Sequence, residues 1–130
     1  PNYTAVENVA LTLELNKFKN PEKEAKLLLD RFGLNHRFNN LPSQLSGGEQ
    51  QRVAIARAIA MKPELILADE PTGNLDPQTS AEVMKVLTEI HQNGKTILMV
   101  THDYALLLKF PFKTLKCEDS KIFEVVQKAL

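Results

Sequence analysis

The most informative segment of the sequence is LSGGEQQRVAIARA, which spans residues 45–58. Two adjacent glycines stand in front of a run that is typical of a helix and unusually rich in alanine. Ser46 and Glu49 have the spacing of a capping box, in which each side chain accepts a hydrogen bond from the backbone N–H of the other residue. The stretch therefore predicts a helix that begins at Ser46 and ends near Met61.

The two glycines have two possible roles. The N–H groups at the start of a helix are unpaired and carry about half a positive charge, so they attract anions. Gly47 and Gly48 would let a phosphate approach this backbone without a Cβ in the way, and Ser46 adds a hydroxyl. Alternatively, Ser46 only caps the helix and the glycines only form the turn. Spacing alone leaves both roles open.

Further along the chain, residues 65–68 and 96–100 form two short, continuously apolar runs. Such runs are typical of strands that are buried on both faces. Between them, Asp76-Pro77 marks the start of a helix that ends near Gly94. The order strand, helix, strand is the pattern of a parallel sheet. The centre of the chain therefore predicts an α/β fold.

The flanking segments predict further elements. Thr4 begins a second capping box and a helix, and Asn20-Pro21 begins another helix. A polar loop is expected over residues 35–45. After Asp103 we expect a short helix, followed by a hairpin over residues 112–126.

Polar side chains follow both apolar runs. Asp69 and Glu70 come directly after the first run, and His102 follows the second. Ligands of parallel sheets bind outside the carboxyl ends of the strands, so we expect these three residues to face one crevice. One carboxylate suits Mg²⁺ held through water, the other suits polarising an attacking water, and the histidine can donate to a phosphate oxygen. Taken singly, such residues are more often solvated or structural.

Composition narrows the classes of function. The chain has 16 basic and 16 acidic residues and no basic block, so the electrostatic footprint of a nucleic-acid binder is absent. The single cysteine, Cys117, cannot form an internal disulfide and fits a reducing compartment. No apolar run is long enough to span a bilayer, so we expect any membrane role to require a partner.

Four motifs together resemble the ATP-binding-cassette (ABC) ATPases. LSGGEQQR resembles the signature motif of this family, and residues 65–70 resemble its Walker B strand with the following glutamate. Residues 74–76 resemble the D-loop, and His102 resembles the switch histidine. The motifs occur in the order of the family. The run over residues 69–76 is most similar to the subgroup of lipoprotein-release, macrolide-export and cell-division ATPases.

The resemblance implies a partial P-loop NTPase fold of the α/β class. Residues 1–62 would form the helical signature subdomain, and residues 63–130 the second part of the parallel-sheet catalytic core. The cofactors would be ATP and Mg²⁺. The resemblance assigns Glu70 as catalytic base, His102 as a contact of the γ-phosphate and Asp69 as the partner of Mg²⁺. It assigns the following residues to nucleotide binding: Ser46, Gly47, Gly48, Glu49 and Asp76.

The resemblance also implies partners. In this family two nucleotide-binding domains sandwich two ATP molecules head to tail, and the signature loop of one domain binds the γ-phosphate held by the other. An integral membrane subunit would bind the dimer at the inner face of the cell membrane, on the cytoplasmic side. Nucleic acid is not an expected partner.

One motif of the family is missing from this chain. The Walker A loop, G-x-x-x-x-G-K-[ST], holds ATP within its own subunit. Gly94-Lys95-Thr96 is a decoy, because Glu89 occupies the place of the earlier glycine and the triplet precedes a strand. We therefore expect this chain alone to neither bind ATP tightly nor hydrolyse it. We also expect unpaired strand edges and a core that is marginal, partly disordered or stabilised by self-association.

Three alternatives remain beside the transporter. The first is a cell-division ATPase, which shares these motifs. The second is a head lobe of a chromosome-maintenance or DNA-repair ATPase, which predicts a coiled coil leading into the signature. Residues 1–45 predict two short helices instead. The third is an interaction module without turnover, which the presence of Asp69, Glu70 and His102 disfavours.

Overall fold

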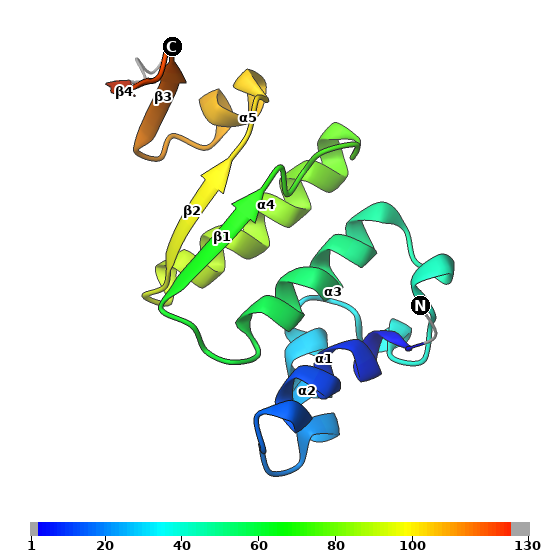
Figure 1. Cartoon of the computed structure of the whole chain (residues 1–130). Helices are drawn as coiled ribbons and strands as arrows, with labels where there is room; N and C mark the ends of the chain where they lie inside the picture. The colour runs from blue at the N-terminus through cyan, green and yellow to red at the C-terminus, as the bar shows by residue number, and fades with distance from the viewer. Residues whose placement is uncertain (1–2, 126–130) are drawn as a thin grey trace. The chain divides into compact units, whose positions relative to one another are not determined.

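A computed structural model describes residues 3–125 of the chain. Figure 1 shows helices α1, α2 and α3 first, after which strands and helices alternate from β1 to β3, and β4 follows. The chain divides into two compact units, Pro1–Val100 and Thr101–Leu130, and each is described by itself. The predicted division at residue 63 concerns subdomains of a larger ATPase core, and it stays a prediction.

Three helices form the first part of the larger unit: α1 (Ala5–Leu15), α2 (Pro21–Arg31) and α3 (Gly47–Ile59). The predicted capping box at Thr4 is present, with Thr4 N donating to Glu7 Oε2 over 2.7 Å and Glu7 N donating to Thr4 Oγ1 over 3.3 Å. The apolar faces of the helices meet in a core whose largest fully buried side chains are Leu13, Leu29, Leu34 and Val9.

Two details of this region differ from the sequence-based expectation. Asn20 precedes α2 with a left-handed φ of 60° and makes no capping hydrogen bond through its side chain, so Pro21 alone marks the start of the helix. The polar loop contains two short 3₁₀ helices, η1 (Asn35–Arg37) and η2 (Pro42–Gln44). The side chain of Gln44 accepts from Leu41 N over 2.8 Å and closes the second of these turns.

The parallel sheet has two strands, β1 (Leu65–Asp69) and β2 (Thr96–Val100). Their register pairs Leu65 with Thr96 and Asp69 with Val100, so both strands end at the same edge. The crossover between them is α4 (Pro77–Gln92), which lies along one face of the sheet in Figure 1. The predicted strand–helix–strand unit is therefore confirmed.

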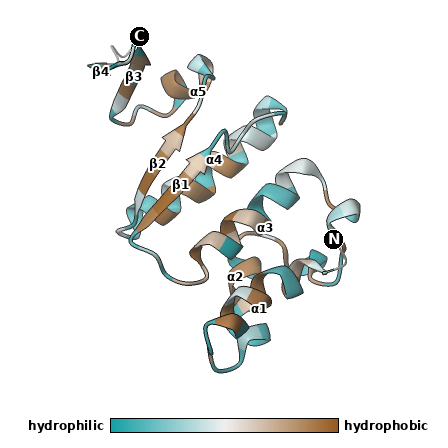
Figure 2. Ribbon diagram, viewed as in Figure 1, coloured by the Kyte–Doolittle hydropathy of each residue, from teal (hydrophilic) through white to brown (hydrophobic). Residues whose placement is uncertain are grey.

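The expectation that both strands are buried on both faces was wrong for this chain. Side chains alternate between the two faces of a strand, and α4 packs on only one of them. Ile66 is 7% exposed, whereas Leu67 and Leu98 are 72% and 54% exposed. Figure 2 shows the apolar character that runs along β1 and β2. Whether this surface drives self-association stays a prediction.

The smaller unit contains α5 (Tyr104–Lys109) and a hairpin of β3 (Thr114–Glu118) and β4 (Lys121–Val125). The antiparallel pairing confirms the predicted hairpin, although residue 126 lies outside the described residues. Asp119 and Ser120 join the strands with φ angles of 48° and 60°, the backbone of a two-residue turn that matches the strand twist. Within residues 3–125, no helix has the length and apolar character to span a membrane.

Candidate functional site

The start of α3 has the geometry that the sequence predicts. Ser46 is the N-cap, with Ser46 N donating to Glu49 Oε2 over 2.8 Å and Glu49 N donating to Ser46 Oγ over 3.2 Å. The hydroxyl of Ser46 accepts in this capping box, so its proton remains available to donate. A helix leaves the N–H groups of its first turn without intrahelical partners. Gly47 and Gly48 occupy that turn, so an anion is favoured at this end of α3.

The two glycines have different surroundings. Gly47 is exposed, and a Cβ there would lie 3.0 Å from Leu75 Cδ2, the end of a flexible side chain. Gly48 is buried, and a Cβ there would lie only 2.2 Å from Thr79 Cγ2 at the start of α4. Neither of the two roles weighed from the sequence explains Gly48 fully, because it also permits close packing of α3 on α4. No local sequence signal reveals this contact.

Glu49 is anchored from a second side. Its Oε1 accepts from Arg37 Nε over 2.9 Å, and His36 Nε2 lies 3.7 Å from the same oxygen. The residue is only 8% exposed. The hydrogen bond from the Ser46 backbone, and secondarily the guanidinium of Arg37, hold the pKa of Glu49 below its ordinary value. Sequence reasoning missed Arg37, which lies in the loop before the motif.

This lowered pKa gives a pH-dependent prediction for the stability of the chain. The stabilisation from ionised Glu49 is present at neutral pH and is lost as the pH falls through the folded-state pKa. At pH 7 we expect the free energy of unfolding of the wild-type protein to exceed that of Glu49→Gln by roughly 1 kcal/mol. This difference should shrink toward pH 3. Urea unfolding at both pH values measures it.

A matched control for this prediction is Glu22→Gln. Glu22 forms an exposed ion pair with Lys26, so its loss should cost little at either pH. A difference between wild type and Glu49→Gln that stays constant from pH 7 to pH 3 would contradict the role of the Glu49 charge.

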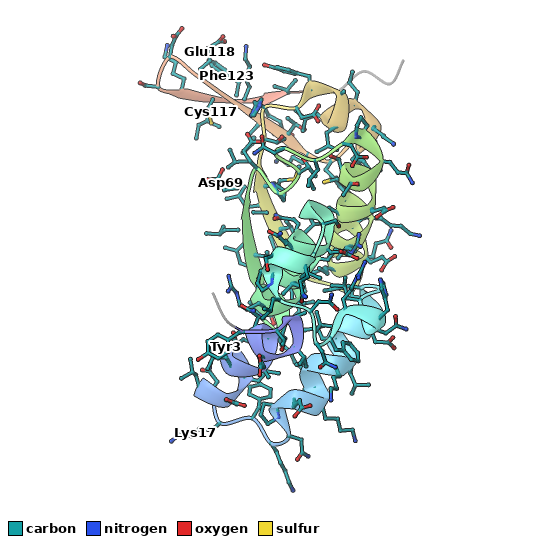
Figure 3. The ribbon with its side chains drawn as sticks, turned by 90° about the vertical axis from the view of Figure 1, so that its right-hand side faces the viewer. Tyr3, Lys17, Asp69, Cys117, Glu118 and Phe123 are labelled. Atoms are coloured by element: carbon teal, nitrogen blue, oxygen red, sulfur yellow. The ribbon has the colours of Figure 1, made fainter. Side chains whose placement is uncertain are left out.

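Asp69 and Glu70 lie at the end of β1, as the sequence predicts. Figure 3 shows Asp69 on the side of the strand away from α4. Glu70 N donates to Val100 O over 2.9 Å, so the backbone pairing with the end of β2 continues one residue past the strand. Glu70 has a left-handed φ of 45°, which is rare for a residue with a Cβ. Such backbone strain is concentrated at functional sites.

The carboxylates here fit Mg²⁺ but not a metal held by the protein alone. Among the described residues, no group of three His, Cys, Asp or Glu side chains could hold a metal ion. Mg²⁺ keeps several waters and is usually held by one or two carboxylates together with substrate phosphates. The exposed carboxylate of Asp69 is of this kind.

Asp76 is the N-cap of α4. Its Oδ1 accepts from Gln78 N and Thr79 N, each over 3.0 Å, and its Oδ2 accepts from the hydroxyl of Thr79. The Thr79 side chain first, and then the Thr79 backbone, hold the pKa of Asp76 below its ordinary value. Asn74, two residues earlier, has a left-handed φ of 62°, which asparagine tolerates better than most residues. Residues 74–76 are therefore a tight turn into α4.

His102 lies two residues after the end of β2 and is exposed. It belongs to the smaller unit, whereas Asp69 and Glu70 belong to the larger one. The prediction that all three residues face one crevice stays a prediction. The functional assignments of the other site residues also stay predictions.

Comparison with known proteins identifies the family. The family profile described as ABC transporter matches residues 1–73, which is more than half of the 130 residues. The chain belongs to the ABC transporter family. Membership of this family accounts for the motifs in the sequence and for the fold.

Relatives in the ABC family also confirm the predicted subgroup. The chain is 48% identical to an ABC transporter ATP-binding protein of Methanocaldococcus jannaschii, over 96% of this chain and 56% of the relative. It is 51% identical to the lipoprotein-releasing system ATP-binding protein LolD of Hydrogenovibrio crunogenus, over 84% of this chain and 49% of the relative. The cell division ATP-binding protein FtsE of Bacillus subtilis is 45% identical, over 94% of this chain and 54% of the relative. The chain spans about half the length of these relatives.

Solved ABC structures share the fold. A metal-chelate type ABC transporter in an inward-facing conformation matches with a TM-score of 0.85 at 28% identity, over 95% of this chain and 52% of that chain. A dimeric ATP-binding cassette in a post-hydrolysis state, bound to ADP and phosphate, matches with a TM-score of 0.70 at 42% identity. The match covers 83% of this chain and 50% of that chain. The predicted partial P-loop NTPase fold is therefore confirmed.

Proposed function

We propose that this chain is the signature-bearing part of an ATP-binding subunit that couples ATP hydrolysis to a membrane partner. The observation that carries the proposal is the start of α3. There the hydroxyl of Ser46 and the N–H groups of the first turn can donate hydrogen bonds to a phosphate. Relatives named for lipoprotein release and macrolide export support the membrane partner. The expected place is the cytoplasmic face of the membrane.

The chain supplies two different sets of groups to this chemistry. The signature loop (residues 46–49) would contact the γ-phosphate of ATP bound to a second domain. Asp69 would hold Mg²⁺ through water, Glu70 would accept a proton from the attacking water, and His102 would donate to the γ-phosphate. Bound Mg²⁺ supplies positive charge that neutralises the phosphates. Because phosphoryl transfer depends on positioning and charge, both half-sites are required.

A cell-division ATPase is the second candidate function. Its support is the match to FtsE of Bacillus subtilis along almost the whole chain. The head lobe of a DNA-repair ATPase is less consistent with the structure. That reading needs a long coiled coil before the signature, whereas α1 and α2 are helices of 11 residues each.

The proposal predicts that the chain alone binds ATP very weakly. A helix terminus contributes about 0.3–2 kcal/mol toward an anion, and a charge-assisted hydrogen bond about 1.5–3 kcal/mol. Even millimolar affinity needs about 4 kcal/mol. Without a Walker A loop in the sequence, we expect a Kd in the millimolar range or weaker and no phosphate release. Calorimetric titration with Mg-ATP, with phosphate release followed on the same sample, measures both.

The proposal as a whole is tested in the full-length ATPase, by which we mean a polypeptide in which a Walker A half precedes this chain. There we expect micromolar ATP affinity and turnover that depends on Ser46. Micromolar affinity in the isolated chain would overturn the assignment of a half-site. Turnover in the full-length ATPase that is unchanged by Ser46→Ala would overturn the role of the signature loop.

A further inference from the structure

The N-termini of α3 and α4 meet at one close contact. A Cβ on Gly48 would lie 2.2 Å from Thr79 Cγ2 but 3.6 Å from Thr79 Cβ, so the γ-methyl of Thr79 fills the space beside the glycine. Both positions are sheltered, since Gly48 is buried and Thr79 is half-buried. At Gly48 the signature loop therefore lies against the γ-methyl group of Thr79.

The orientation of that methyl group is fixed by Asp76. The hydroxyl of Thr79 donates to Asp76 Oδ2, and Thr79 N donates to Asp76 Oδ1. Rotation about χ1 would move Cγ2 away from Gly48, but it would also break the bond from the hydroxyl to Asp76. Thr79 thus joins two motifs that are far apart in the sequence: its oxygen binds the D-loop (residues 74–76) and its methyl contacts the signature loop.

A second link holds the two helices in register. Arg52 Nη1 donates to Glu82 Oε2 over 2.9 Å, from α3 to α4, and the side chain of Arg52 is only 15% exposed. This ion pair lies about one turn further along each helix than the Gly48–Thr79 contact, so two contacts join the first turns of α3 and α4.

We propose that Thr79 is a positioning residue that couples the D-loop to the signature loop within one chain. Movement of Asp76 is transmitted through the Thr79 side chain to the N–H groups of Gly47 and Gly48, which receive the phosphate. This inference rests on the proposed function for its role in catalysis. The contact itself is a property of the folded chain and is tested without nucleotide.

The test adds a methyl group at position 48 and removes one at position 79. Gly48→Ala places a Cβ within 2.2 Å of Thr79 Cγ2 and should lower the Tm of the 130-residue chain by roughly 5 °C or more. Thr79→Ser removes Cγ2 and keeps the hydroxyl for Asp76. In the double variant the new Cβ meets Thr79 Cβ at an ordinary distance of 3.6 Å. We expect the double variant to recover most of the lost Tm.

Gly47→Ala is the matched control. Its Cβ meets only the flexible end of Leu75, so its Tm should change little, and Thr79→Ser should not alter the effect of Gly47→Ala. If Thr79→Ser fails to rescue Gly48→Ala, or rescues Gly47→Ala equally, the proposed contact does not exist.

Transmission is read by NMR of the chain. Asp76→Asn should shift the amide signals of Gly47 and Gly48 in wild-type background and should leave them unmoved in a Thr79→Ala background. A simple structural role for Thr79 would not produce this dependence. Equal shifts in both backgrounds would overturn the coupling.

Turnover in the full-length ATPase completes the test. We expect Gly48→Ala to lower the rate of ATP hydrolysis by at least tenfold and the double variant to recover it. If wild type hydrolyses ATP but the double variant remains as slow as Gly48→Ala, the coupling by Thr79 fails and the proposed function stands. If wild type shows no hydrolysis while the NMR and Tm results hold, the proposed function fails and the coupling stands.

Discussion

Glu70→Gln in the full-length ATPase is expected to lower the rate of ATP hydrolysis by about 10²–10⁴-fold while leaving ATP affinity within a few-fold of wild type. A glutamine has the shape of the glutamate but cannot accept a proton from the attacking water. Glu70 lies one residue past β1, where its N–H binds Val100 O and its φ is 45°. The substitution preserves these backbone contacts. Single-turnover phosphate release and equilibrium nucleotide binding separate the two effects.

The matched control is Asp69→Asn, at the last residue of β1. If Asp69 serves Mg²⁺, its substitution should raise the Mg²⁺ concentration needed for half-maximal rate, whereas Glu70→Gln should leave that concentration unchanged. Turnover near the wild-type rate in Glu70→Gln would refute the assignment of the base. An equal shift in Mg²⁺ dependence for both variants would show that the two carboxylates share one role.

The sequence predicted the elements whose signals are local. The capping boxes at Thr4 and Ser46 depend on residues three positions apart, and both are present in the structure. The apolar runs that became β1 and β2 and the Asp-Pro start of α4 are also short patterns. Because the carboxyl ends of parallel strands share an edge, the strand–helix–strand pattern alone was enough to place the ends of β1 and β2 together.

Contacts between distant segments could not be predicted in the same way. The packing of Gly48 on Thr79 depends on the angle between α3 and α4, and the ion pair of Arg37 with Glu49 depends on how the loop before the motif folds back. The exposure of Leu67 depends on which elements cover the sheet, which an apolar run does not specify. The sequence showed that residues 46–49 form a cap but not what holds the cap in place.

Gly47→Asp is expected to abolish turnover of the full-length ATPase while leaving the fold intact or slightly more stable. A carboxylate at the first helical position interacts favourably with the helix dipole by about 0.3–1 kcal/mol. The new Cβ meets only the flexible end of Leu75. The same carboxylate would stand where the γ-phosphate is expected to bind.

The loss of function follows from charge repulsion. Two like charges about 4 Å apart repel by about 4 kcal/mol at the effective dielectric constant of a partly exposed site, which corresponds to a loss of about three decades in affinity for the partner's nucleotide. ATP-driven dimerisation and turnover should both fall by about this amount, measured by analytical ultracentrifugation and phosphate release.

Gly47→Asn separates charge from size at this position. Asparagine has the shape of aspartate without the charge, so it should retain far more activity than Gly47→Asp if electrostatic repulsion is the cause. Equal losses in the two variants would mean that bulk alone blocks the site, and the N–H groups of α3 would then act by close approach of the backbone. Turnover unaffected by either variant would mean that no phosphate binds at the start of α3. A Cβ at position 47 meets Leu75 Cδ2 and not Thr79, so these variants do not alter the contact that Gly48 makes with α4.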